Sequence, residues 1–180
     1  MTNKKILTIF ILLLLYIGGK HLFKYVDRLN IENKQRKATL FETLSVKFPI
    51  KYKVVLNDFV DSNPNAPIIS YGIEKDSIEY GFLGLKFPDG DACLENDKEC
   101  YKKLINKLIK SVDGRIESES LYKVRDYEGL SVTFQYDHNK KGLYQIIRIK
   151  DGLFTITVAG HSNFMDNVDV KDFLSSIELL

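Results

Sequence analysis

LSVTFQYDHNKKGLYQIIRIKDGLFTITVAG occupies residues 130–160 and holds the clearest structural pattern in this chain of 180 residues. Apolar residues at 130, 132, 134 and 136 alternate with polar residues at 131, 133 and 135, which is the period of a strand with one buried face. Residues 137–142 read as a hairpin loop and 144–150 as a second strand. Asp151-Gly152 is a two-residue turn signal before a third strand over 153–159. The stretch therefore predicts an antiparallel meander.

The rest of the chain adds strands and helices to this meander. Strands are predicted around 46–56, over 68–73 and 78–87, and over 115–124, and Gly84 marks a bulge in the third of these. An amphipathic helix is predicted from about 97 to 112, with Gly114 suited to the left-handed position after it. Residues 166–176 predict a short closing helix. The fold class is therefore α+β: one domain over residues 44–180, with an antiparallel sheet flanked by helices.

An apolar run at residues 6–19 decides how the chain relates to a membrane. As a helix it spans about 21 Å, short of a hydrocarbon core of about 30 Å. Leu22, Phe23 and Val26 continue the apolar stripe, and flanking lysines can snorkel, so residues 1–26 are predicted to be an uncleaved anchor. A cleaved signal peptide is the alternative, although no A-x-A-like site follows the run.

Charge is distributed unevenly along the chain. Residues 20–53 carry a net charge of +6, whereas residues 54–180 carry −6. We interpret residues 27–43 as a basic stalk or linker helix that either faces anionic headgroups or is simply solvated. Nucleic-acid binding is disfavoured, because the folded part is acidic and contains no recognised motif.

No catalytic or metal-binding motif is found in the sequence. His21, His138 and His161 lack a second ligand at metal spacing and read as exposed loop residues. The acidic cluster over residues 89–99 lacks the EF-hand spacing, and we interpret it as a turn followed by acidic residues at the start of a helix. We therefore predict no enzyme activity, no metal and no cofactor.

Cys93 and Cys100 are the only two cysteines, seven residues apart. In an exported domain they would form a structural disulfide around the acidic turn, whereas in a cytosolic domain they would remain thiols. The pair is not a C-x-x-C redox motif.

The loop over residues 57–66 is rich in Pro, Asn and Asp. It is either a plain surface connector or a contact surface, in which case Phe59 and Val60 are the candidate contact residues.

Several core segments together resemble the PsbP-like superfamily, in particular the PsbP-like and DcrB-like proteins of the bacterial envelope. They are Phe48-Pro49, Asp113-Gly114-Arg115-Ile116, Tyr127-Glu128-Gly129-Leu130, residues 143–149 and 154–160, and Phe173-Leu174-Ser175-Ser176-Ile177. The resemblance covers about residues 44–179 and departs from the lipoprotein members, because no lipobox cysteine is present. It implies an antiparallel sheet flanked by helices and a non-enzymatic binding or assembly role, and it transfers no catalytic residue.

These observations lead to one expected function and one alternative. We expect a single-pass protein of the inner membrane with its domain outside the cytoplasm. There it would act as a non-catalytic binding or accessory module for another envelope protein or a peptide segment. The flanking charges leave the orientation open, and the resemblance and the cysteine pair favour the exterior. The alternative is an exported enzyme or metal-dependent protein whose site has no recognisable motif. The oligomeric state does not follow from the sequence.

Overall fold

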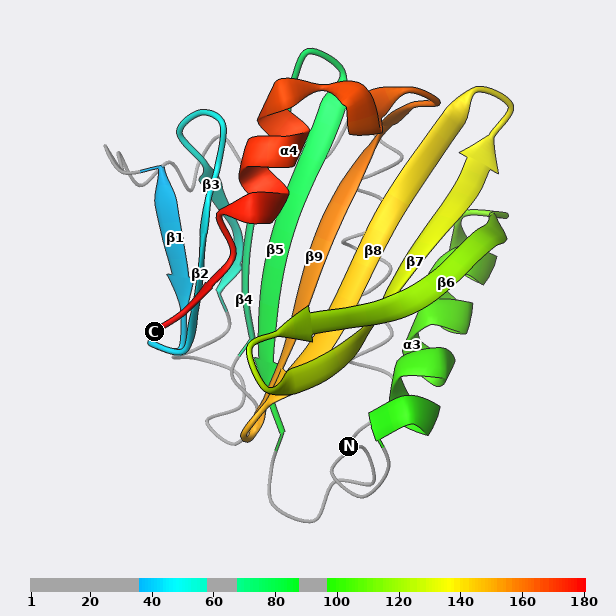
Figure 1. Cartoon of the computed structure of the whole chain (residues 1–180). Coiled ribbons are helices and arrows are strands. Elements are labelled where there is room, and N and C mark those ends of the chain that lie inside the picture. Colours follow the sequence, from blue (N-terminus) through cyan, green and yellow to red (C-terminus); the bar gives the residue numbers. More distant parts are fainter. Residues whose placement is uncertain (1–35, 58–67, 88–96) are drawn as a thin grey trace.

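The computed structural model describes residues 36–57, 68–87 and 97–180. Two sheets and two α-helices make up this part of the chain (Figure 1). The larger sheet has seven strands, in the spatial order β3-β4-β5-β9-β8-β7-β6. They are β3 (Lys53–Asn57), β4 (Ile68–Lys75), β5 (Ile78–Lys86), β6 (Arg115–Val124), β7 (Tyr127–Asp137), β8 (Lys140–Ile149) and β9 (Gly152–His161). Every neighbouring pair is antiparallel.

The predicted meander forms β7, β8 and β9. Its second turn comes one residue earlier than expected. Ile149 pairs with Gly152, so the turn residues are Lys150 and Asp151, and Lys150 has a φ of 57°. The burial of β7 follows the alternation in the sequence: Val132 and Phe134 are fully buried, while Thr133 between them is only partly buried.

Helix α3 (Asp97–Ser111) packs on one face of the large sheet, against β7, and is drawn at the lower right in Figure 1. We call the cluster beneath it the α3-side core, and its helix residues share one stripe: Cys100, Tyr101, Leu104, Ile105, Leu108 and Ile109. The helix ends as a Schellman motif, because the Gly114 amide donates to the Ile109 carbonyl at 2.8 Å. The left-handed residue is Asp113, with a φ of 49°, and not Gly114 as predicted.

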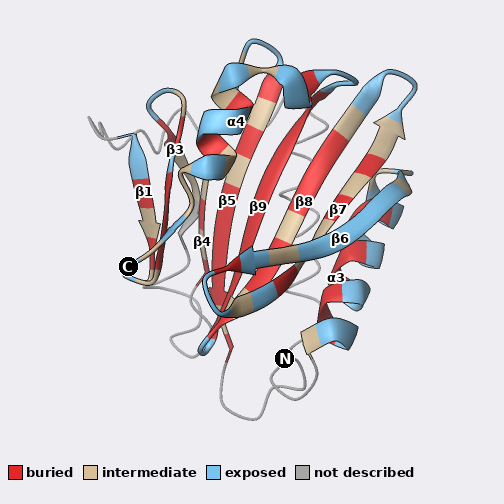
Figure 2. Cartoon of the chain, in the orientation of Figure 1, coloured by how far each residue is buried: buried red, intermediate tan, exposed pale blue. Residues whose placement is uncertain are grey.

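The opposite face carries the smaller sheet and α4 (Val168–Ser175), which lies in front of β5 in Figure 1. The smaller sheet has the order β1-β2-β10, with β1 (Lys37–Leu40), β2 (Leu44–Lys47) and β10 (Glu178–Leu179). We call the cluster between these layers the α4-side core; its largest fully buried side chains are Phe48, Tyr80, Phe82, Phe154 and Phe173. Figure 2 shows the buried interior of β5 and β9 between the two layers.

The closing helix was predicted over residues 166–176. The structure divides this stretch into a 3-10 turn, Phe164–Asp166, and α4. Asn167 separates them as the N-cap of α4, and its side chain accepts a hydrogen bond from the Asp169 amide at 2.8 Å. Capping by Asn explains why the helix begins at residue 168.

Two predictions in the N-terminal half are wrong. The linker helix does not continue to residue 43, because residues 37–40 form β1, in which Ala38 and Leu40 are fully buried. Gly84 is not at a bulge, because its pairing with Ile69 and Phe154 is in register. A Cβ there would lie 2.8 Å from the Phe41 ring, so the glycine allows the β1–β2 hairpin to approach the large sheet.

The predicted anchor at residues 1–26 and most of the predicted stalk lie outside the described residues. In the three described ranges, no helix combines the length and the hydropathy that a bilayer crossing requires.

Candidate binding pocket between β2 and α4

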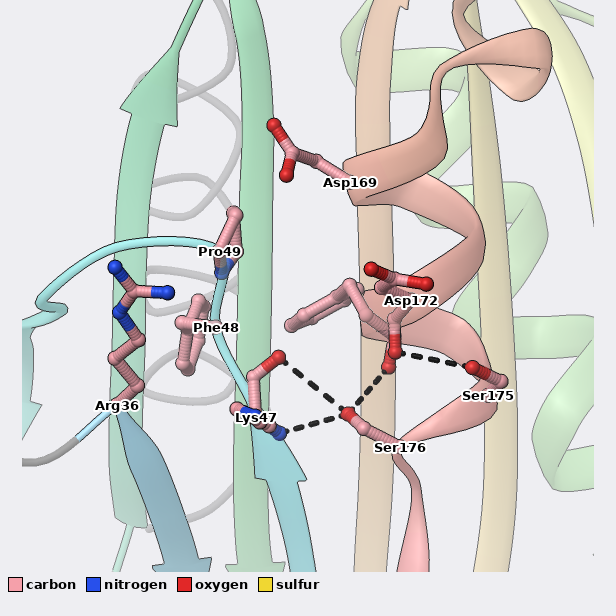
Figure 3. A pocket seen from close by; sticks show the side chains of 9 residues that line it. Arg36, Lys47, Phe48, Pro49, Asp169, Asp172, Ser175 and Ser176 are labelled. Atoms are coloured by element: carbon pink, nitrogen blue, oxygen red, sulfur yellow. Dashed lines mark hydrogen bonds between the residues drawn. The ribbon is translucent and has the colours of Figure 1, made fainter.

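A pocket of about 280 Å³ opens between the end of β2 and helix α4 (Figure 3). One wall comes from the N-terminal strands and the other from the helix, segments far apart in sequence. The lining residues are Arg36, Lys47, Phe48, Pro49, Asp169, Asp172, Phe173, Ser175 and Ser176.

The walls are held together by an aromatic contact and a serine. The rings of Phe48 and Phe173 lie 5.1 Å apart between centroids, and both are almost completely buried. Ser176 follows the last helical residue, and its Oγ accepts a hydrogen bond from the Lys47 amide at 2.8 Å. The same hydroxyl donates to the Phe173 carbonyl at 2.7 Å. These contacts connect β2 directly to the C-terminal end of α4.

The pocket mouth carries both signs of charge. Asp169 forms an ion pair with Lys75, which holds this end of α4 against β4. In contrast, no ion pair within the described ranges engages the side chains of Arg36, Lys47 or Asp172. Three exposed charges therefore remain available to a ligand above an aromatic floor.

The two serines that line the pocket are held by the backbone of α4. The Ser175 and Ser176 hydroxyls both donate to backbone carbonyls of the last helical turn. The lining therefore combines these serines with charged and aromatic groups that can hold a polar ligand.

Of the sequence-predicted site residues, Cys100 lies within the described ranges, and it is not among the residues that line this pocket. Cys100 lies in the first turn of α3, is 5% exposed and is disulfide-bonded. Cys93 lies outside the described residues, so its pairing with Cys100 stays a prediction. Phe59 and Val60 also lie outside them.

The histidines and acids described by the structure have ordinary surroundings. His138 lies in the β7–β8 turn and His161 ends β9, both exposed. Asp97 and Glu99 occupy the first turn of α3 and pair with Arg148 at 2.9 Å and with Lys103 at 3.5 Å. The described ranges contain no group of three or more metal-ligating side chains with suitable geometry.

A separate polar feature lies on the opposite face of the large sheet. Ile78 and Tyr80 point into the α4-side core, so Glu79 between them points to the α3 side. Its Oε2 is buried and has no hydrogen-bond partner among the residues that the structure describes. Burial first, and then the charge of Glu74 opposite it on β4, raises the pKa of Glu79 to about 8, while Lys140 acts in the other direction. Because the pocket is on the other face, Glu79 is not part of it.

Sequence reasoning missed the pocket because its walls are brought together by long-range contacts. Lys47 and Ser176 are 129 residues apart, and neither belongs to a motif that carries chemistry. The only signal was indirect: Phe48-Pro49 and Ser175-Ser176 were among the segments that carried the family resemblance.

Comparisons with known proteins address the fold. No family model matches the sequence, and no curated protein matches it significantly. Among solved structures, the cyanobacterial PsbP of Synechocystis, CyanoP, superimposes with a TM-score of 0.55 over 84% of this chain and 96% of that chain, at 7% identity. The chain has the PsbP-like fold. The resemblance predicted from the core positions is thus confirmed at the level of fold.

Two further structures resemble this PsbP-like domain less closely. LpqN of Mycobacterium tuberculosis, described as involved in cell envelope biogenesis, gives a TM-score of 0.41 at 8% identity, over 86% of this chain and 94% of that chain. PA94 of Pseudomonas aeruginosa, a putative regulator by its description, gives 0.43 at 10% identity, over 74% and 88%. Scores below 0.5 do not define a shared fold.

Proposed function

We propose that this PsbP-like domain is a non-catalytic binding or accessory module of the bacterial envelope, and that the β2–α4 pocket is its contact site. The single observation that carries the proposal is the state of the pocket's polar groups. Its serine hydroxyls are engaged by the backbone, whereas Arg36, Lys47 and Asp172 expose charges that no ion pair uses in the described ranges. Such a lining offers recognition without a nucleophile.

The ligand class follows from the shape and charge of the pocket. It has an aromatic floor and presents two cations and one free carboxylate around its mouth. A polypeptide segment with acidic and basic side chains would match all three charges at once, and electrostatic complementarity gives such contacts specificity. The proposed partner is therefore an envelope protein with a charged segment.

The proposed location is the extracytoplasmic side of the inner membrane, with residues 1–26 as a single-pass anchor. The apolar run at residues 6–19 supports attachment. The bonded state of Cys100 supports an oxidising compartment, because structural disulfides persist there and are rare in the cytosol.

Affinity capture from crosslinked membranes tests the contact site. Full-length wild-type chain is compared with Asp172→Lys, which reverses the free carboxylate at the pocket, and with Asp166→Lys, which changes an exposed acid outside it. We expect one partner to be recovered with wild type and Asp166→Lys and lost with Asp172→Lys. Equal recovery with all three chains, or no specific partner, would reject the pocket as the contact site.

A further inference from the structure

Strand β6 is a terminal strand of the large sheet, and its outer edge has no neighbour among the described strands. It is ten residues long, and residues 117–121 are all exposed, as the pale blue of β6 in Figure 2 shows. Leu121 near its middle is 57% exposed, one of few large apolar side chains in the described ranges that face solvent to this extent. A long edge strand with an exposed apolar residue is a template for pairing with another chain.

Charges on an edge strand usually prevent such pairing. The order of the charges along β6 therefore decides whether they repel a second strand or match it. Glu119, Leu121 and Lys123 alternate with other residues and therefore share one face of β6. Consider a second copy of the chain whose β6 pairs antiparallel with this edge. A two-fold axis through Leu121, perpendicular to the sheet, then places the two copies of Leu121 opposite each other. The same axis places Glu119 opposite Lys123 of the second copy, and this pair occurs twice by symmetry.

Other registers of antiparallel self-pairing are worse. An axis through Glu119 places Arg115 opposite Lys123, two like charges, which destabilises a cross-strand pair. An axis through Ser120 leaves Leu121 opposite Glu119, and an axis through Tyr122 leaves it opposite Lys123. Only the register centred on Leu121 pairs the apolar residue with itself and both charges with their opposites.

The charges required for this register are accessible. Glu119 has no ion pair in the part of the chain that the structure describes. Lys123 pairs with Glu128 at 2.7 Å, but both side chains remain about half exposed, which leaves the ammonium group room for a second carboxylate. We infer that β6 is a dimerisation edge, on which a second copy of this chain adds its own β6 in antiparallel register centred on Leu121.

Cysteine crosslinking of the full-length chain in membranes tests the register. In antiparallel pairing, directly opposite residues have Cα atoms about 4.5–5.5 Å apart, within the span of a disulfide. Leu121→Cys should therefore form a disulfide-linked dimer under mild oxidation. Glu119→Cys is the matched control on the same strand and face. In the proposed register its two copies lie four residues out of step, roughly 13 Å apart, and no linked dimer should form. Glu119→Cys combined with Lys123→Cys should restore it.

The outcomes distinguish pairing in the proposed register from crosslinks formed by random encounters between chains. A linked dimer from Leu121→Cys and from the double variant, but not from Glu119→Cys, supports the register. Equal crosslinking of Leu121→Cys and Glu119→Cys overturns it, and so does no crosslinking of Leu121→Cys. In detergent, the wild-type chain should sediment as a dimer and Leu121→Lys as a monomer; since Leu121 is exposed, this change should leave the circular dichroism spectrum of the folded chain unaltered. A wild-type chain that stays monomeric at high concentration would also refute the inference.

Discussion

Glu79 provides a quantitative test of the packing on the α3 side of the large sheet. Its pKa is raised from 4.5 to about 8, chiefly by burial and then by Glu74. Between these two values the folded chain holds a proton that the unfolded chain has released. The free energy of unfolding should therefore fall as pH rises from about 4.5 to about 8, with the stabilisation complete below the lower value.

The size of this effect follows from 1.36 kcal/mol per pKa unit. At pH 7 the contribution of Glu79 is about 3 kcal/mol less favourable than at pH 4.5, as an upper figure, because side-chain relaxation and water entry reduce it. Glu79→Gln removes the titrating group and keeps the shape of the side chain. The variant should match wild type in stability at pH 5 and exceed it at pH 8.

Urea denaturation at pH 5 and pH 8 measures the difference. Glu74→Gln is the matched control, because it removes the second cause of the shift but leaves the burial of Glu79 intact. We expect it to keep most of the wild-type pH dependence. The reasoning would be refuted if Glu79→Gln and wild type lost the same stability between the two pH values, since the carboxyl would then be solvated in the folded chain.

The remaining predictions concern the pocket walls, the cysteines and the N-terminus. Phe173→Ala should lower the free energy of unfolding by about 3–5 kcal/mol, because a fully buried ring is lost. Ser176→Ala should lower it by about 1 kcal/mol, because the hydrogen bond to the Lys47 amide is lost. Chemical denaturation that shows no loss for Phe173→Ala would contradict the packing. Thiol labelling of the denatured chain without reductant should leave Cys93 and Cys100 unmodified, and two labelled thiols would disprove the disulfide. N-terminal sequencing of the membrane fraction should find the N-terminus retained, whereas a start near Lys20 would show cleavage. Protease treatment of spheroplasts should remove the domain, and its survival would reverse the predicted orientation.

Local periodicity was sufficient to predict most of the large sheet. β7, β8 and β9 are consecutive, so each strand pairs with a neighbour in sequence, and an alternating pattern with short turns specifies such a meander. Helix α3 was equally clear, because its apolar stripe and its lysines occupy opposite faces.

Elements fixed by long-range contacts were not predicted. Residues 37–40 belong to a polar, basic stretch that reads as a linker, yet they form β1 because Ala38 and Leu40 fill the α4-side core. Tertiary packing also explains Gly84, whose role depends on Phe41 lying across it. The pocket belongs to the same class, because it exists only where the ends of β2 and α4 meet.

Site-specific photo-crosslinking tests the central claim, that the β2–α4 pocket binds a partner, most directly. A photoreactive residue replaces Ser175 at the pocket in the full-length chain in cells, and Lys107 on the exposed side of α3 serves as the control. The account predicts a discrete adduct with one envelope protein from position 175, lost when Asp172→Lys is added, and none from position 107. Absence of an adduct at position 175, or the same adducts from both positions, would contradict it.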